Sequence, residues 1–378
     1  MEAEEQTIDG TGIRRRQARA LRLRSPRHRR HGRAERDLRV DNVRGILIIL
    51  VVIGHFLLPF SRTPLVTNLI YGIYSFHMPC FVLLSGFYAK SAFRNGHFRW
   101  GKVVQFLWLY VLYKLLVDIT EGLLAGSIPL VPDFLHESGA PWYLFAISCW
   151  YLTLPLLHRF RRLSRWPLNG IVLLAILLLV VFGKYFVTCG DFLCMDRVLS
   201  FAPFFYLGYF CSPKLLGRYL ASGWKRWVNL LALLLALGFL FFSYSVLYPV
   251  HLVFYGAQYT RYAPSLWNWL WLINLLWYAA ALVLSLGLIG VMTSRRIGFV
   301  TKIGQRTLQV YVLHRPIRDL AQYFGLYALL DAASAPDVLL VLLLAFGVSA
   351  ALSGRAISRL FQYLRTAADP FLRHWNAL

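Results

Sequence analysis

The segment DNVRGILIILVVIGHF, Asp41–Phe56, decides the fold class of this chain. It is apolar over almost its whole length, as is typical of a helix that crosses a membrane. Arg44 and His55 interrupt it with ten residues between them, which is roughly 16 Å along a helix at ~1.5 Å per residue. Because ionisable side chains are costly in hydrocarbon, they usually mark a substrate path or a catalytic centre.

The composition of the remaining sequence agrees with this first span. Of 378 residues, 58% are hydrophobic and only 15% are charged, and the mean hydropathy is +0.54. Soluble domains carry about 25% charged residues, and stretches long enough to cross ~30 Å of hydrocarbon recur along the chain. The sequence therefore predicts an all-α, polytopic membrane protein rather than a soluble domain.

Ten candidate spans can be drawn, and the loops that follow every second span are rich in basic residues. Because basic loops stay in the cytoplasm, this alternation predicts that both termini are cytoplasmic. We expect a disordered basic tail over residues 1–40, a ten-helix domain over 41–360 and a short basic tail over 361–378, in a multi-pass protein of the plasma membrane. The spans are 43–60, 66–89, 102–119, 141–157, 168–188, 197–211, 227–248, 269–292, 305–327 and 337–353.

The formal net charge of +23 could suggest a nucleic-acid-binding protein. Its densest part, IRRRQARALRLRSPRHRRHGR at residues 13–33, contains no Phe, Trp or Tyr. Nucleic-acid binding requires a basic face with base contacts or stacking aromatic residues. We therefore expect no nucleic-acid partner, and we predict that this tail is attracted to anionic membrane lipid.

Three histidines on separate predicted spans have similar depths near the middle of the membrane: His55, His77 and His314. A shared polar cavity would follow if their helix faces meet. Histidine titrates near neutrality and can take a proton from a hydroxyl nucleophile. The alternative for each is a hydrogen bond between helices, and we prefer catalysis most strongly for His55 because of its pairing with Arg44.

The basic residues near the inner edge are candidates for binding a phosphorylated donor. Arg44, Arg99 and Lys102 have the charge for this, although Arg99 and Lys102 could also be ordinary cytoplasmic-edge cations. Arg315 lies deeper and needs an anionic partner or water. Ser85 precedes Gly86, a pair that is more typical of a close helix contact than of a nucleophile, and Trp142 is one candidate oxyanion donor.

The cysteines give little evidence of chemistry. Cys189 and Cys194 share the predicted external loop TCGDFLCMD, where an oxidising compartment would permit a disulfide. The sequence leaves that pairing open. The other three lie within spans and suit packing. No metal-ligand spacing is present, so we expect no metal site.

Several segments together resemble the integral-membrane acyltransferase type 3 family, especially its fucose 4-O-acetylase-like branch. They are DNVRGILIILVVIGH, YSFHMPCFVLLSGFY, APWYLFAISCWYLTLPLL, FAPFFYLGYF and IGQRTLQVYVLHRPI, and they follow the family's order from about Asp41 to about Ile317. Arginine, ten residues and then histidine is the family's principal signature, which Arg44 and His55 satisfy. The basic N-terminal tail lies outside the resemblance.

The resemblance implies transfer of an acyl group, commonly acetyl, from acyl-CoA as co-substrate to a hydroxyl of a sugar, glycan or glycolipid, with no bound cofactor. His55 would be the catalytic base and Arg44 the essential arginine. The family usually has two basic residues three apart at the start of the third span, and here they read Lys102 and Gln105. Donor binding would then fall to Lys102 and Gln105, with Arg99 as a substitute. His77, Ser85, Trp142, His314 and Arg315 are assigned to the acceptor or the cavity.

Two other classes of function stay open at this point. A transporter or flippase for a glycolipid or anionic metabolite would use the same histidines and arginines for proton coupling or substrate binding. No internal repeat is evident, which counts mildly against that class. A membrane scaffold would depend on residues 1–40, whereas catalysis would not.

Overall fold

The computed structural model describes residues 38–60, 63–127, 132–137, 139–163, 166–187 and 189–367. The chain is helical almost throughout these ranges, apart from a two-stranded antiparallel hairpin, β1 (Phe93–Arg94) and β2 (His97–Phe98). The basic tail expected at residues 1–40 lies almost wholly outside the described residues, and its disorder stays a prediction. The fold class predicted from the sequence is confirmed: this is an all-α membrane protein.

Each of the ten predicted spans coincides with a helix or with a pair of helices. Their bounds are α2 (Arg39–Leu57), α3 (Pro64–Tyr74) with α4 (His77–Ala89), α5 (Gly101–Ala125), α6 (Trp142–Leu163), α7 (Trp166–Gly183), α8 (Met195–Phe210), α10 (Trp224–Leu247), α11 (Leu270–Val291), α13 (Thr307–Tyr323) and α14 (Ala335–Leu352). Three further α-helices lie between or after them: α9 (Pro213–Ala221), α12 (Gly298–Gly304) and α15 (Arg355–Thr366). The 3₁₀ helices are η1 (Leu58–Phe60), η2 (Lys90–Ala92), η3 (Tyr248–Tyr255), η4 (Tyr259–Arg261), η5 (Pro264–Trp269) and η6 (Leu326–Ala328).

Six helical segments of the described chain are both long and apolar enough to cross a membrane. They are Arg39–Phe60, Pro64–Ala92, Gly101–Ala125, Trp224–Tyr255, Pro264–Val291 and Ala335–Leu352. A shorter apolar helix covers Leu168–Gly183. A polytopic membrane protein is therefore established, while the count of ten crossings stays a prediction.

The second predicted span, a single apolar stretch over 66–89, is broken in the middle, between α3 and α4. Pro79 causes the break. It lacks an N–H to donate to the carbonyl four residues earlier, and its ring would clash with that carbonyl, which belongs to Ser75. The Ser75 carbonyl instead accepts a hydrogen bond from Nε1 of Trp277 on α11, at 2.9 Å. The break thus sets the point at which α4 begins, at His77.

Contacts between loops fall into two groups, one for each end of the bundle. At the end where α2 begins, the Asn42 amide donates to the carbonyl oxygens of Thr293 and Arg295, at 2.9 and 2.8 Å. At the opposite end, the Thr63 hydroxyl donates to the Ala332 carbonyl at 3.1 Å. Such contacts agree with helices that alternate in direction, as the basic loops predicted, and the end near Asn42 corresponds to the expected cytoplasmic side, called the inner end below.

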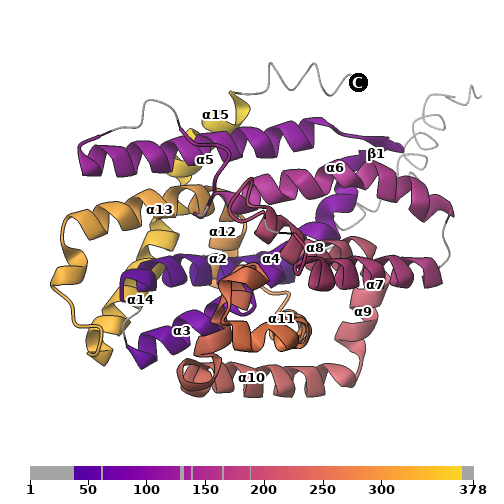
Figure 1. Ribbon diagram of the computed structural model, residues 1–378. Coiled ribbons are helices and arrows are strands. Elements are labelled where there is room, and N and C mark those ends of the chain that lie inside the picture. Colours follow the sequence, from indigo (N-terminus) through magenta and orange to yellow (C-terminus); the bar gives the residue numbers. More distant parts are fainter. Residues whose placement is uncertain are drawn as a thin grey trace, which may run out of the picture. The chain divides into compact units, whose positions relative to one another are not determined.

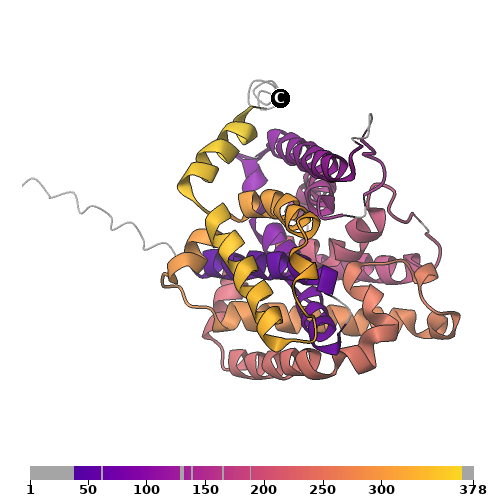
Figure 2. The ribbon, with the colours of Figure 1, turned by 90° about the vertical axis from the view of Figure 1, so that its left-hand side faces the viewer.

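Helix α2 occupies the centre of the helical unit. Figure 1 shows α2 and α4 across the middle, α5 and α6 above them, and α3, α10 and α11 below. Figure 2 gives the view from the side on which α13, α14 and α15 lie. Helix α15 joins α5 through the Trp108 indole, which donates to the Leu364 carbonyl at 3.1 Å. The expected boundary between the domain and its C-terminal tail, at residue 360, therefore falls inside a packed helix.

Helices α4 and α8 cross at a pair of glycines, Gly86 and Gly208. A Cβ at Gly86 would fall within the van der Waals radius of the Phe205 carbonyl oxygen, and one at Gly208 would meet the Leu83 carbonyl. The close helix contact that the serine–glycine pair at 85–86 predicts is confirmed by the geometry at Gly86.

Replacing Gly86 with alanine is expected to destabilise the protein by about 1–3 kcal/mol, because the three nearest atoms that oppose the new methyl group all belong to the backbone of α8. The midpoint of thermal unfolding in detergent measures this. Gly238→Ala on α10 is the matched control, since nothing lies within 4 Å of its Cβ position. A Gly86 variant as stable as the Gly238 variant would show that α4 and α8 can separate without cost.

Candidate active site

Arg44 and His55 lie on one face of α2. Eleven positions along an α-helix complete about three turns, so the two side chains point in nearly the same direction from the axis. The Arg44 guanidinium carbon lies 4.7 Å from the centroid of the Tyr88 ring. Both side chains are partly buried. The helix therefore presents a cation near its inner end and an imidazole about three turns deeper.

Backbone hydrogen bonds fix the tautomer of all three candidate histidines. Nδ1 of His55 lies 2.8 Å from the Val51 carbonyl oxygen. The corresponding distance is 2.7 Å from His77 to Ile73 and 2.8 Å from His314 to Tyr311. Since a carbonyl oxygen only accepts, Nδ1 carries the proton in each neutral ring and Nε2 keeps the lone pair. Each ring is thus prepared to accept a proton at Nε2.

The rings of His55 and His314 are in direct contact, and Tyr74 lies between His55 and His77. The centroids of the His55 and His314 rings are 4.9 Å apart, in an edge-to-face arrangement. Tyr74 lies 6.4 Å from His55 and 4.9 Å from His77, again between centroids. Four rings from α2, α3, α4 and α13 therefore form one group, which we call the histidine cluster: His55, Tyr74, His77 and His314.

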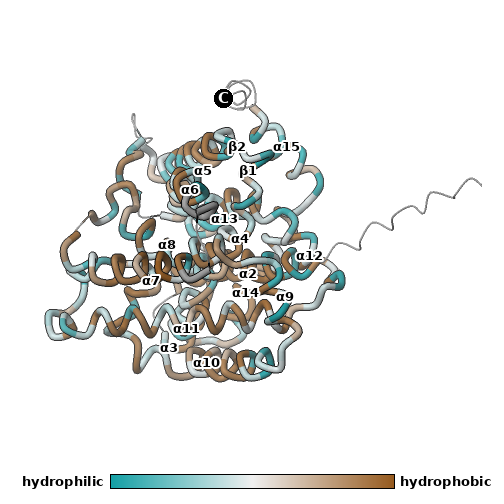
Figure 3. The backbone as a smooth tube through the Cα atoms, turned by 90° about the vertical axis from the view of Figure 1, so that its right-hand side faces the viewer, coloured by the Kyte–Doolittle hydropathy of each residue, from teal (hydrophilic) through white to brown (hydrophobic). Residues whose placement is uncertain are grey.

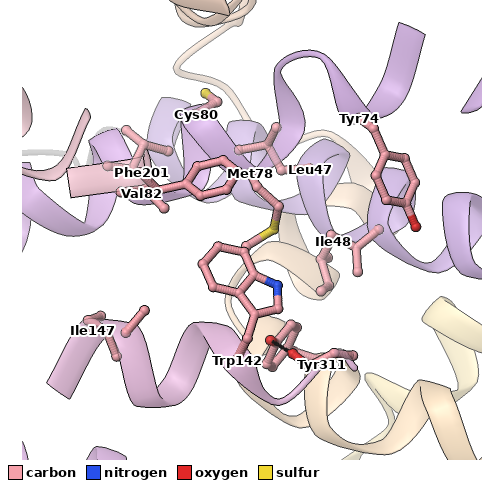
Figure 4. Close-up of a cluster of buried hydrophobic side chains, with 14 of the residues drawn as sticks. Leu47, Ile48, Tyr74, Met78, Cys80, Val82, Trp142, Ile147, Phe201 and Tyr311 are labelled. Atoms are coloured by element: carbon pink, nitrogen blue, oxygen red, sulfur yellow. Dashed lines mark hydrogen bonds between the residues drawn. The ribbon is translucent and has the colours of Figure 1, made fainter. Parts of the chain in front are cut away.

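A cavity of about 260 Å³ begins at Arg44 and runs between α2, α4, α5, α6 and α13. One wall carries a polar pair, in which the Ser85 and Tyr143 hydroxyl oxygens are 2.5 Å apart. Figure 4 shows a cluster of buried apolar side chains that includes Ile48, Met78 and Ile147 of the cavity wall, with the Trp142 ring nearby. The lining residues are Arg44, Ile48, Met78, Phe81, Ser85, Tyr88, Phe106, Tyr143, Leu144, Ile147, Tyr151, Thr307, Leu308 and Tyr311.

Arg44 has the charge to bind an anion at the mouth of this cavity. Among the described residues, none of the ion pairs includes Arg44. Its guanidinium instead faces the Tyr88 ring, which leaves its N–H donors available for a ligand. A phosphate or carboxylate at the inner end would be the complementary partner.

The other predicted donor-binding residues lie at the start of α5, beside the cavity rather than in its wall. Lys102 lies within electrostatic reach of Arg99 and of Arg365 on α15. Tyr151, which lines the cavity, is close enough to both Arg44 and Arg99 for electrostatic interaction. Gln105 is half-buried and is not a lining residue. The sequence places Arg365 in the expected C-terminal tail, 361–378. In the structure it belongs to α15, which packs against α5 and so lies near Lys102.

Arg315 forms ion pairs with two carboxylates, as expected for a cation that lies deep in the membrane domain. Its Nη2 lies 2.7 Å from a carboxylate oxygen of Glu121 on α5, and its Nε lies 3.1 Å from both oxygens of Asp319. Asp319 also pairs with Arg318. The Asp319 contact follows from its spacing of four residues on one helix. Glu121 could not be found from sequence, because it comes from a different helix.

A further ion pair joins α5 to the segment before α6. Lys114 Nζ lies 3.5 Å from a carboxylate oxygen of Glu137. Burial raises the pKa of the Glu137 carboxyl, and the attraction of Lys114 opposes that shift. Trp142 is close to the same loop, with its ring 6.0 Å from the guanidinium carbon of Arg197. Trp142 is buried against Phe201 and does not line the cavity at Arg44.

Several buried polar atoms of the histidine cluster and its surroundings have no hydrogen-bond partner among the described residues. They include Nε2 of His314, the Tyr113 hydroxyl and Nε of Arg318. Buried polar atoms are almost always paired with protein, water or a ligand. The surroundings of the cluster therefore suit a polar molecule such as an alcohol.

The cysteines of the predicted external loop carry free thiols, as do Cys80, Cys149 and Cys211. Cys194 is buried and its thiol lies 3.8 Å from the Trp142 carbonyl oxygen. The pairing that the sequence left open is thus absent from the structure.

Comparison with known proteins gives a family for this arrangement. A family model described as "Acyltransferase domain" matches residues 37–354. The chain is 32% identical over 153 residues to "Nodulation protein NolL" of Sinorhizobium fredii (strain NBRC 101917 / NGR234), over 36% of this chain and 41% of that protein. It is 28% identical over 151 residues to "Nodulation protein NolL" of Mesorhizobium japonicum (strain LMG 29417 / CECT 9101 / MAFF 303099), over 37% and 40% respectively. The alignments thus span about two fifths of these relatives, and no solved structure matches the chain.

The family match covers most of the chain and includes α2 with Arg44 and His55, the cavity and the histidine cluster. It confirms the family that the sequence motifs indicated, and it favours an enzyme over a transporter or a scaffold. The chain belongs to the acyltransferase-domain family and has a polytopic, all-α membrane fold.

Proposed function

We propose that this protein transfers an acyl group, with acetyl as the expected group, from acyl-CoA to a sugar hydroxyl of a glycan or glycolipid at the plasma membrane. The observation that carries the proposal is the shared face of α2. It presents the Arg44 guanidinium, which lines a cavity and belongs to no ion pair among the described residues, and the His55 imidazole, whose Nδ1 is hydrogen-bonded to the Val51 carbonyl, in nearly the same direction. An anionic donor and a base for the acceptor are the two requirements of this reaction.

The donor would enter from the inner end, where basic residues gather. Arg44 would bind a phosphate of CoA, with Arg99, Lys102 and Arg365 adding positive potential nearby. The largely apolar cavity beyond Arg44 suits the uncharged pantetheine arm. Tyr311 in its wall has its ring 6.2 Å from the His314 ring, between centroids, so the thioester would lie beside the histidine cluster. The acceptor would approach from the opposite side, near Tyr113 and Arg318.

The chemical step needs one base and one electrophile. His55 Nε2 takes the proton of the acceptor hydroxyl while the oxygen attacks the thioester carbonyl. The tetrahedral intermediate then collapses, the C–S bond breaks, and the CoA thiolate takes the proton from the His55 imidazolium. The products are an O-acyl ester and free CoA. His314, in contact with His55, would hold the imidazole in place.

A transfer assay in sealed proteoliposomes tests this function. Labelled acetyl-CoA is supplied on one side only, with a glycan extract as acceptor and labelled acetyl phosphate as an alternative donor. Label on glycan from acetyl-CoA alone supports the proposal, and label from acetyl phosphate alone overturns the assignment of the donor. Loss of thioester without labelled glycan would overturn the assignment of the acceptor.

A further inference from the structure

Two apolar cavities adjoin on the side of the bundle formed by α7, α8 and α11. The first, of about 330 Å³, lies between α4, α7, α8, α9 and α11. The second, of about 320 Å³, lies between α7, α8 and α11. Leu173, Leu207 and Leu282 line both, so they form one continuous groove, which we call the α8 groove. Figure 3 shows the hydrophobic character of α7 and α8 along it.

The length of the α8 groove suits one acyl chain of a bilayer lipid. Its lining residues on α11 run from Leu275 to Ile289, which is about 21 Å at the rise of an α-helix. The hydrocarbon core of a bilayer is about 30 Å thick, and a single acyl chain reaches about half of that depth. The groove is therefore long enough for one lipid chain and too short to pass through the membrane.

The inner end of the α8 groove carries two cations. Helix α9 closes the inner end, with Leu215, Leu216 and Tyr219 in the groove wall and with Lys214 and Arg218 exposed. The Tyr219 hydroxyl donates to the Leu286 carbonyl at 3.0 Å, which fixes α9 against α11. The sequence has no Asp or Glu between Asp196 and Asp319, so no carboxylate of the α9 and α10 region neutralises these cations.

We propose that the α8 groove is a binding site for an anionic phospholipid of the inner leaflet. One acyl chain would occupy the groove, and the headgroup phosphate would bind Lys214 and Arg218. An apolar groove of this length suits an acyl chain, and the two exposed cations beside its inner end suit an anionic headgroup. These residues differ from those of the Arg44 cavity and of the N-terminal tail, so the site is independent of the acyl transfer proposed above.

Native mass spectrometry of the purified full-length protein in detergent tests the proposal. The protein is titrated with phosphatidylglycerol and with phosphatidylcholine of identical chains. Lys214→Gln with Arg218→Gln should raise the apparent Kd for phosphatidylglycerol about thirtyfold, with little change for phosphatidylcholine. Arg355→Gln with Arg359→Gln, which removes two exposed cations of α15, is the matched control. Equal effects of the two double variants, or equal binding of the two lipids by the wild type, would overturn the headgroup assignment.

A second pair of variants tests the chain. Leu282→Trp adds volume where the two cavities join and should weaken binding of both lipids at unchanged charge. Leu233→Trp, on an exposed position of α10, is its control and should bind like the wild type. A Leu282 variant with wild-type affinity would overturn the assignment of the groove, whether or not acyl transfer is ever observed.

Discussion

Replacing His55 with alanine is expected to lower the rate of acyl transfer by about 10²–10⁴-fold, the contribution of a positioned general base. The reason is that Nε2 of His55 is the group proposed to take the acceptor proton, while Nδ1 is committed to the Val51 carbonyl. Single-turnover transfer from labelled acetyl-CoA measures the chemical step without product release. Binding of CoA should be unchanged, because Arg44 lies about three turns away.

His77→Ala is the matched control for this experiment. His77 has the same hydrogen bond from Nδ1 to a carbonyl four residues earlier, and Tyr74 lies between it and His55. A loss of tenfold or less is expected there. If the His55 variant kept more than a tenth of the wild-type rate, the role of base would pass to His314, whose Nε2 is buried and has no partner among the described residues.

Arg44→Ala is expected to lower kcat/KM for acetyl-CoA by about 10- to 150-fold, the usual worth of a hydrogen bond to a charged group. The loss should appear mainly in KM, because Arg44 is proposed to hold a phosphate that is remote from the thioester. Acetyl-pantetheine, which lacks the phosphates, separates this effect from a general loss of structure. Its transfer should be slow in the wild type and nearly unaffected by the substitution.

Two further variants sharpen the result for Arg44. Arg44→Lys keeps the charge and loses the planar pair of donors, so an intermediate KM is expected. Arg94→Ala removes an exposed cation from the β1 and β2 hairpin, and it should leave both donors unaffected. Equal losses with acetyl-CoA and acetyl-pantetheine in the Arg44 variant would mean that Arg44 supports the fold rather than the donor.

The sequence predicted those parts of the protein that depend on one helix at a time. Apolar length gave the positions of the spans, and the spacing of Arg44 and His55 predicted a shared face, because helical geometry alone determines it. The depth of each histidine could be counted from the membrane edge in the same way. These predictions needed no knowledge of which helices are neighbours.

What the sequence did not predict depends on the rotation of one helix against another. The contact of His55 with His314, the partner of Arg315 on α5 and the Ser85–Tyr143 pair each join distant segments. An almost uniformly apolar helix gives little indication of which face meets a neighbour, so these pairs depend on tertiary packing. The break before His77 was predictable in principle from Pro79, since proline removes the hydrogen bond that would continue the helix.

The break between α3 and α4 has a mechanical consequence. A gap in a transmembrane helix can act as a hinge when its backbone groups are unpaired, but here the Ser75 carbonyl is held by Trp277 and the Ser75 hydroxyl donates to the Gly72 carbonyl at 2.8 Å. With its polar groups satisfied, the joint is stiff. A displacement of α11 would then move Tyr74 and His77 together as a rigid unit. The break in the helix therefore couples α11 to the histidine cluster and does not act as a flexible hinge.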